Sequence, residues 1–326
     1  MNLKTLSFQV HFVKFVCRKM VCLFLLIMTS TLMYAQNAVS HDSLEIAKQY
    51  YNNKEYSKAL PIFLGSSENV YAQECLGECF HNGWGVEKDV KTAFQWWSKA
   101  AEQGSSIGQY HLALCYDYGY GVDKDIEKAV YWYEKAANNG HSSAQYNMGW
   151  CYEQVNNYEQ ARYWYEKAAN QGHIKAMFNL GICWLYHRDY KKAVYWWTEG
   201  AAQGDTHCMY NLGLCYENGN GVKKVDNKQA VYWLSQAANH GYHKAQNSLA
   251  IHYLEGKGVK RNAKVAVFWF EKAASQNSVV AQYNLGKCYE GGDGVKKDYQ
   301  KARYWYEQAA NNGYYKAKEK LKTLKK

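Results

Sequence analysis

The feature that most constrains the fold is a pair of short sequence phrases that recurs seven times at a nearly fixed period. The first phrase is clearest in residues 145–152, Gln-Tyr-Asn-Met-Gly-Trp-Cys-Tyr, and it returns at 178–184, 210–216 and 282–289. The second is clearest in residues 129–137, Ala-Val-Tyr-Trp-Tyr-Glu-Lys-Ala-Ala. A unit that repeats at this period cannot bury its apolar face alone and has to stack on its neighbours. We therefore expect an all-α solenoid.

The phrases divide the chain into a leader, an array of repeats and a short tail. The seven repeats are expected at 69–104, 105–140, 141–172, 173–204, 205–241, 242–277 and 278–313. Residues 36–68 are predicted to form one further helix pair, and residues 314–326 a lysine-rich capping helix, since an array needs a polar end for solubility. The single proline of the chain, Pro61, favours helices nearly throughout, because proline interrupts helix interiors.

Each repeat is predicted to contain two antiparallel helices, called here helix A and helix B. In the third repeat, helix A is expected at about 144–153 and helix B at about 158–170. Longer repeats carry a Gly-x-Gly-Val turn between the helices, as at 219–222 and 292–295, whereas the third and fourth repeats have shorter turns. Glycine suits these turns because it tolerates positive φ.

The first 35 residues have the pattern of a secretory signal peptide. Lys14, Arg18 and Lys19 precede the apolar run 21–28, and Ala35 offers a small residue for cleavage. The run is short for a membrane span, which needs about 20 residues. We expect export to the periplasm, the outer surface or the medium, with no stable membrane insertion after cleavage. An uncleaved anchor is the alternative.

The formal net charge of +10 is concentrated at the two ends. The leader has four basic residues and no acid, and the tail after Tyr315 has six lysines and one acid, so the body is close to neutral. A nucleic-acid-binding protein should carry a basic stripe along its body. No nucleic-acid partner is therefore expected.

The repeats resemble the Sel1-like repeat family, a branch of the tetratricopeptide-like solenoids. The matching pattern is Ala-x3-Leu-Gly-x2-Tyr, Gly-x-Gly-Val, Lys-Ala-x2-Trp-Tyr and Lys-Ala-Ala-x2-Gly, and it is nearly complete in residues 281–313. The resemblance implies a right-handed superhelix of helix pairs. It also implies an adaptor for protein complexes, often in bacterial envelopes, whose helices A line the concave face.

Helical periodicity places one side of helix A on the core, with Ala144 and Met148, and the opposite side toward a partner. The candidate partner-binding residues are those on the outward side of helix A in five of the repeats. They are Tyr110, His111, Leu114, Tyr146, Asn147, Trp150, Phe178, Asn179, Ile182, Tyr210, Asn211, Leu214, Tyr283 and Asn284. An open groove with these residues would hold an extended protein or peptide partner. The alternative is that the aromatic members seal the seam between neighbouring repeats.

Helix B carries a tryptophan at one fixed position in every repeat, from Trp96 to Trp305. A stripe at helical spacing is typical of a core, and a glycan-binding platform of exposed aromatics is the alternative function.

One cysteine per repeat, from Cys79 to Cys288, occupies the same position before an aromatic residue, with His252 in its place once. Equivalent positions in stacked helices lie ~10 Å apart, beyond the reach of a disulfide, so buried thiols are expected. Cys75 and Cys208 are additional cysteines, for which a local pairing is the alternative to a free thiol.

Some cysteine-rich relatives with a disulfide in each repeat are described as β-lactamases or penicillin-binding proteins. Here Ala136-Ala137 stands where such a relative needs its second cysteine, and the mature chain has no Ser-x-x-Lys motif. The histidines near Cys208 match no zinc spacing, and the glycine turns lack the context of a phosphate loop. We therefore expect no catalytic site, metal or cofactor.

Overall fold

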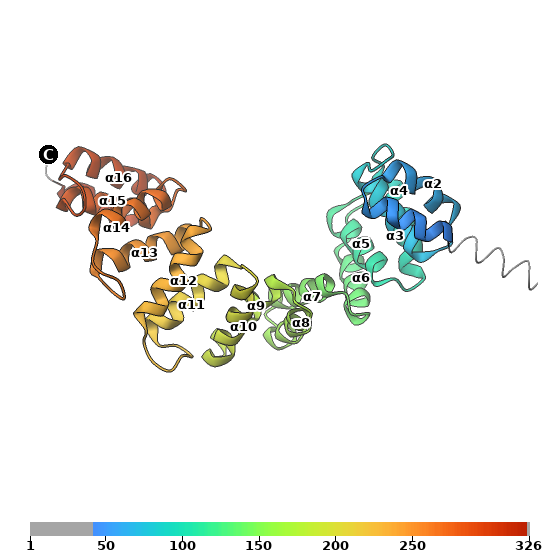
Figure 1. The fold of residues 1–326 in the computed structure, drawn as a ribbon, viewed down its shortest axis with the longest axis horizontal. Helices are drawn as coiled ribbons and strands as arrows, with labels where there is room; N and C mark the ends of the chain where they lie inside the picture. Colours follow the sequence, from blue (N-terminus) through green and yellow to red (C-terminus); the bar gives the residue numbers. More distant parts are fainter. Residues whose placement is uncertain (1–41, 325–326) are drawn as a thin grey trace, which may run out of the picture. The chain divides into compact units, whose positions relative to one another are not determined.

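The computed structural model describes residues 42–324, so the predicted signal peptide lies outside the described residues. The described residues divide into two compact units, 42–141 and 142–324. All regular structure in the described part is helical, and within each unit every helix packs on the next (Figure 1). The expected all-α solenoid architecture of stacked helix pairs is confirmed. Over residues 42–324, no helix combines the length and hydrophobicity of a membrane-spanning segment.

The N-terminal unit begins with a helical segment at 42–52 that pairs in sequence with α2, as expected for the extra helix pair. The helices of the unit that follow this segment are α2 (Tyr56–Gly65), α3 (Val70–Asn82), α4 (Val90–Glu102), α5 (Ser106–Tyr118) and α6 (Ile126–Asn138).

The C-terminal unit contains the remaining repeats and ends in the expected lysine-rich helix, α17. Its helices are α7 (Ser142–Gln154), α8 (Tyr158–Asn170), α9 (Ile174–Tyr186), α10 (Tyr190–Ala202), α11 (Thr206–Asn218), α12 (Asn227–Asn239), α13 (His243–Glu255), α14 (Ala263–Ala274), α15 (Val279–Gly291), α16 (Tyr299–Asn311) and α17 (Tyr315–Thr323). Odd-numbered helices from α3 to α15 are helices A, and even-numbered helices from α4 to α16 are helices B.

The core of each repeat forms where a small residue on helix A meets a large residue on helix B. Gly181 of α9 lies so close to Trp197 of α10 that a Cβ there would be 2.2 Å from the indole nitrogen. Trp197 is almost fully buried, and its Nε1–H donates to the Phe178 carbonyl at 3.2 Å. This close approach explains the glycine of the first phrase.

The tryptophans at the fixed position on helix B only partly form this core. Trp164 and Trp196 are buried, but the other five are half-buried: Trp96, Trp132, Trp233, Trp269 and Trp305. The residue that follows each tryptophan is the one that fills the core, as Trp197 and Tyr165 do. The prediction that the tryptophans form the core was therefore off by one position, because the next residue along the helix fills the core.

A buried glutamine at the start of helix A ties neighbouring repeats together. The Gln246 amide donates to the Ala238 carbonyl at 3.2 Å and accepts from Gln276 Nε2 at 2.9 Å. Gln282 makes the equivalent pair of contacts with Ala274 and Asn312. These side chains satisfy the polar groups of the turn between repeats, which would otherwise be buried without partners.

Candidate partner-binding surface

The predicted partner-binding residues are divided between the two units. Tyr110, His111 and Leu114 lie in the N-terminal unit, and the other members lie in the C-terminal unit. We call the surface formed by the outward side chains of helices A in the C-terminal unit the A-helix face. All of the predicted residues are half-buried except Trp150, which is 51% exposed.

The aromatic members of the set pack on the next repeat. Tyr146 stacks on His173 with ring centroids 4.8 Å apart, and Tyr283 meets Tyr314 edge-on at 5.2 Å. In the N-terminal unit, Tyr110 stacks on His141 at 4.3 Å. These rings therefore contribute to the seam between repeats, which was the alternative to an open groove in the sequence analysis.

The amide members fall into two groups. Asn284 donates to Asn247 of the preceding repeat at 3.1 Å. Burial raises the pKa of the Tyr146 and Tyr165 hydroxyls, and the neighbouring Asn179 amide partly offsets this rise. Asn147 and Asn211, by contrast, make no side-chain hydrogen bond within residues 42–324. These two amides and exposed Trp150 are therefore available to a partner.

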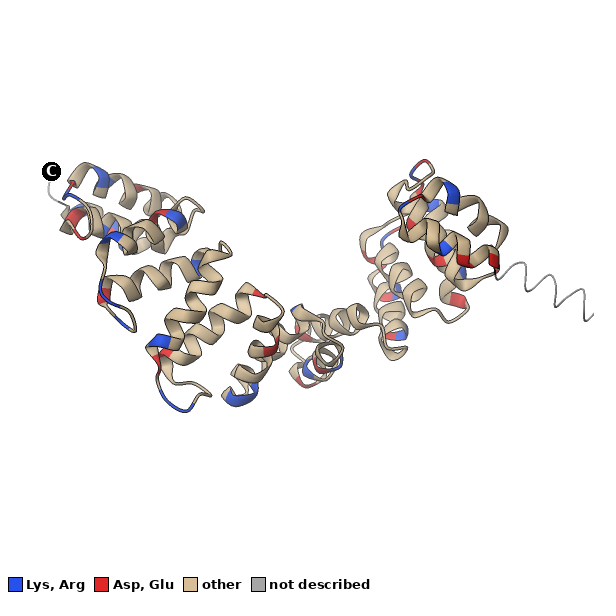
Figure 2. Ribbon diagram, viewed as in Figure 1, with Lys and Arg blue, Asp and Glu red and all other residues tan. Residues whose placement is uncertain are grey.

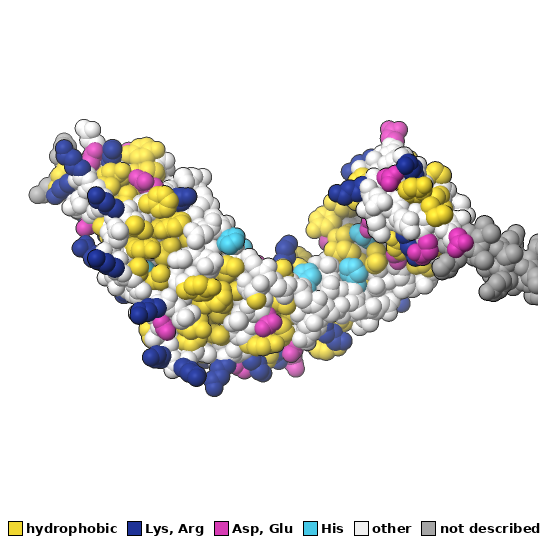
Figure 3. All heavy atoms as spheres, in the orientation of Figure 1, with side chains coloured by type: hydrophobic (Ala, Val, Ile, Leu, Met, Phe, Trp, Pro, Cys, Tyr) yellow, Lys and Arg dark blue, Asp and Glu magenta, His cyan; other side chains and the backbone are white. Residues whose placement is uncertain are grey.

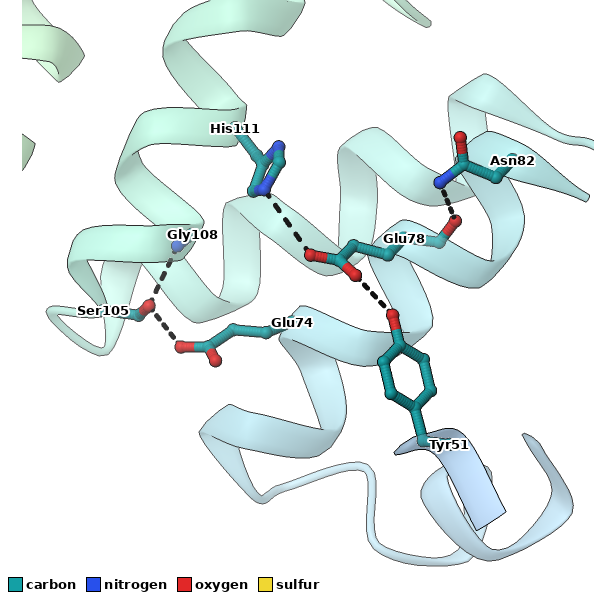
Figure 4. Close-up of polar contacts among 7 residues, drawn as sticks. All are labelled: Tyr51, Glu74, Glu78, Asn82, Ser105, Gly108 and His111. Atoms are coloured by element: carbon teal, nitrogen blue, oxygen red, sulfur yellow. Dashed lines mark hydrogen bonds and ion pairs between the residues drawn. The ribbon is translucent and has the colours of Figure 1, made fainter. Parts of the chain in front are cut away.

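The N-terminal unit holds a polar cluster that the sequence interpretation did not identify (Figure 4). Glu78 of α3 accepts a hydrogen bond from the Tyr51 hydroxyl and lies 3.7 Å from Nε2 of His111 on α5. Nearby, the Ser105 hydroxyl donates to Glu74 at 2.5 Å and accepts from the Gly108 amide at 2.9 Å, which caps α5. Carboxylates on α3 thus bind side chains of the elements before and after it.

The protonation of this cluster follows from its burial. Burial lowers the pKa of His111 to about 4, with further lowering from His141 and His81. Burial also raises the pKa of Glu74. His111 is therefore neutral at neutral pH, so its contact with Glu78 is not an ion pair there. His111 also stacks on Trp97 at 4.5 Å, which favours a structural role.

A carboxylate near the end of helix A recurs in register with the repeat. Asp117, Glu153 and Glu290 each accept a hydrogen bond from a helix-B tyrosine hydroxyl, at 3.1, 2.7 and 2.6 Å. Two further carboxylates in register with the repeat, Asp125 and Asp298, accept backbone N–H bonds at the starts of α6 and α16.

A cavity of about 410 Å³ lies between the third and fourth repeats, inside the C-terminal unit. It is lined by Glu153 and by residues of α8, α9 and the following turn: Tyr158, Ile182, Cys183, Tyr186 and His187. Only Ile182 among these was predicted as a partner-binding residue. The short turns of these two repeats were the signal in the sequence that marked this place.

Helix B presents a second surface that the sequence interpretation missed. In six of the seven repeats the residue before this tryptophan is an aromatic side chain about half exposed, from 47% to 56%: Tyr131, Tyr163, Tyr195, Tyr232, Phe268 and Tyr304. Each ring meets the following tryptophan edge-on at 5.0 to 5.1 Å. Figure 3 shows patches of hydrophobic side chains flanked by lysines and arginines over the C-terminal unit.

The described cysteines are buried, except Cys151, which is half-buried. Cys75, Cys115 and Cys208 are buried free thiols, so the local pairing considered for Cys75 and Cys208 is not present. Burial raises the pKa of Cys115 to about 12 and that of Cys183 to about 11. Thiols of this kind are protonated at neutral pH and are poor nucleophiles. Residues 42–324 contain no cluster of three metal-ligating side chains.

Comparison with known protein families identifies the repeat type. The Sel1 repeat model matches residues 70–105, 106–141, 142–173, 174–205, 206–242, 243–278 and 279–314. The chain belongs to the Sel1 repeat family. Each matched repeat begins one residue after the boundary expected from the sequence phrases. Sel1 repeats form scaffolds that typically mediate protein interactions, and this chain has that architecture.

Two solved structures of Sel1-type proteins are similar over most of the chain. A protective antigen of uropathogenic Escherichia coli strains, which displays an SLR fold, is 30% identical with a TM-score of 0.77. The similarity covers 87% of this chain but only 64% of that antigen, so this chain spans less than two thirds of its length. A Sel1 repeat protein from Oxalobacter formigenes is 33% identical over 91% of both chains, with a TM-score of 0.63. Comparison with curated proteins gives no match.

Proposed function

We propose that this Sel1 repeat protein is an exported, non-enzymatic scaffold that binds a protein or peptide partner on its A-helix face. The observation that carries the proposal is the group of side chains there that the fold leaves unused. Trp150 is half exposed, and Asn147 and Asn211 have no hydrogen-bond partner within residues 42–324. Spaced amides can bind the backbone of an extended peptide, while an exposed indole is a frequent centre of binding energy.

Several features support the other parts of the proposal. The basic and apolar pattern of the leader supports export. Lys/Arg and Asp/Glu residues are intermixed along the helices of each unit (Figure 2), which favours a protein partner over a polyanion. The buried thiols of high pKa support a role without nucleophilic catalysis.

Affinity purification with residues 36–326 as bait tests the partner and the face together. A Trp150→Ala/Asn211→Ala variant removes unused side chains only, so its helicity should equal that of the wild type. A Tyr146→Ala variant is the matched control for a seam residue and should lower stability. A partner retained by the wild type and lost from the double variant supports the proposal. Identical lists of retained proteins from wild type and double variant would contradict it.

Export has its own measurement. Mass spectrometry of the protein from its native host should find the mature N-terminus near Gln36 in the envelope or the medium. A protein that keeps its leader and is found inside the cell would contradict this part of the proposal.

Glycan binding is a second candidate, favoured by the exposed aromatic residues of helix B. Flat rings can stack on sugars, but three of these rings are partly covered by a lysine from the next turn of the same helix. Lys135, Lys167 and Lys272 lie 5.2, 4.8 and 5.0 Å from the ring centroids of Tyr131, Tyr163 and Phe268. Sedimentation with peptidoglycan, compared between wild type and Tyr163→Ala/Tyr232→Ala, separates this function from the first.

A further inference from the structure

The fourth repeat lacks a loop that in the fifth and seventh repeats lies against the preceding helix B. In the fifth repeat, Gly221 adopts φ +72° and lies so close to the Tyr190 carbonyl at the start of α10 that a Cβ would be 2.2 Å away. Gly294 lies equally close to the Ala263 carbonyl at the start of α14. The fourth repeat has only the turn at 187–189 in this place. Tyr158 at the start of α8 is accordingly 48% exposed, whereas Tyr190 is half-buried.

The cavity of about 410 Å³ therefore occurs where the loop is missing. In the seventh repeat, the loop residue Val295 packs against the hydrophobic core around α14 and α15. No loop valine exists in the fourth repeat, and Ile182 of α9 lines the hollow together with Tyr158 and Tyr186. A volume of this size is in the range of small-ligand sites, and the cavity has room for one long side chain.

One wall of the cavity carries a carboxylate without a cationic partner. Glu153 is half-buried and accepts from the Tyr165 hydroxyl through Oε2, and no basic side chain of residues 42–324 lies within 4.0 Å of it. The equivalent Glu290 accepts from Tyr306 in the same way and also pairs with Lys320 Nζ at 2.9 Å. The chain therefore contains its own example of a cation bound at this position.

The fifth repeat shows a related arrangement. Its equivalent carboxylate, Glu217, lies 3.6 Å from Nε2 of His252 in the next repeat. In the fourth repeat, Cys183 occupies the position of His252 and offers no basic group. Arg162 and Lys192, from the helices on either side, instead stack on Trp184 at 4.6 and 4.0 Å.

We propose that this cavity binds a lysine or arginine side chain of the partner. The cation pairs with Glu153, as Lys320 pairs with Glu290, and the aliphatic stem lies along Ile182. The rings of Tyr158 and Tyr186 add cation–π attraction and cover the stem. This inference rests on the proposed function, since it names the side chain with which a partner on the A-helix face is anchored.

Methyl NMR of the mature protein labelled at isoleucine tests the site without the partner. The probes are the amides of Nα-acetyl-lysine, Nα-acetyl-arginine and Nα-acetyl-norleucine, the last being an uncharged analogue of lysine. We expect the Ile182 methyl signal to shift and saturate with the two cationic probes, with norleucine weaker by about tenfold, because a hydrogen bond to a charged group contributes roughly 1.5 kcal/mol or more.

Two variants define the result. Glu153→Gln should lower lysine affinity about tenfold, while its amide oxygen still accepts from Tyr165 and preserves the fold. Glu217→Gln, the same change at the equivalent position outside the cavity, should leave the titration unchanged. Equal affinity for norleucine and lysine, an unchanged titration in Glu153→Gln, or an unshifted Ile182 signal would overturn the proposal. The titration involves no partner, so its failure leaves the A-helix face intact, and failure of the affinity purification leaves the cavity result intact.

Discussion

The packing of Gly181 against Trp197 gives a prediction that tests how the repeats are built. Gly181→Ala places a methyl group 2.2 Å from the indole nitrogen and 2.6 Å from Cε2 of a ring that is 2% exposed. The ring has to move, which also weakens its hydrogen bond to the Phe178 carbonyl. Overpacking of a core costs about 1–3 kcal/mol and a lost hydrogen bond about 1 kcal/mol. Alanine recovers about 1 kcal/mol of helix propensity.

The expected result is a net loss of about 1–3 kcal/mol in the free energy of unfolding, from these three contributions. The sixth repeat supplies the control, because Ala250 and Phe270 are both buried in one core cluster at the equivalent positions. Gly181→Ala/Trp197→Phe reproduces that pair. We therefore expect Trp197→Phe to cost less in the Gly181→Ala background than alone, by at least about 1 kcal/mol.

Urea denaturation followed by far-UV circular dichroism measures the four members of this cycle. The transition midpoints are compared along with the slopes, because repeat arrays can unfold in more than one step. A Gly181→Ala protein as stable as wild type, or additive effects in the double variant, would refute the account of the core.

Three further predictions concern the seams, the turns and acid stability. Gln246→Ala should lower the free energy of unfolding by about 1–3 kcal/mol, because the Ala238 carbonyl and the Gln276 amide lose their partner. Gln246→Met copies Met177, the equivalent residue of the fourth repeat, and should cost less in the same urea assay. Arg188→Gly should raise the melting temperature, since Arg188 adopts φ +59°, where a side chain costs about 1–2 kcal/mol; a lower melting temperature would contradict this. The unfolded state takes up a proton at His111 below about pH 6.5, but the folded state only below a pKa of about 4. Stability should therefore fall as pH falls through this window, and less steeply in His111→Asn when unfolding is measured against pH.

The period of the sequence was sufficient to predict the architecture but not the surfaces. The two recurring phrases and their period predicted stacked helix pairs, and the structure has them. The tryptophan stripe misled by one position, because the wide apolar side of helix B includes both the tryptophan and the residue after it. The partner-binding prediction could not separate seam from groove, since Tyr146 and Asn147 are neighbours on one helix and differ only in what the next repeat places beside them.

Other features depended on contacts between repeats that no single repeat reveals. The pairing of Glu290 with Lys320 joins two helices whose alignment the phrases alone do not give. The cavity beside Glu153 follows from the absence of a loop in the following repeat, so it became visible only when the neighbouring loops were seen to cover α10 and α14.

The central claim, that a partner binds the A-helix face, is tested most directly by photo-crosslinking in the native envelope. A photoreactive phenylalanine analogue replaces Trp150 on the A-helix face in one protein and Tyr232, an exposed aromatic residue of helix B, in another. Both side chains are 51% exposed, so their intrinsic access to solvent is matched. The account predicts a protein or peptide adduct from position 150 and none from position 232. An adduct from position 232 alone would contradict it and place the partner on helix B.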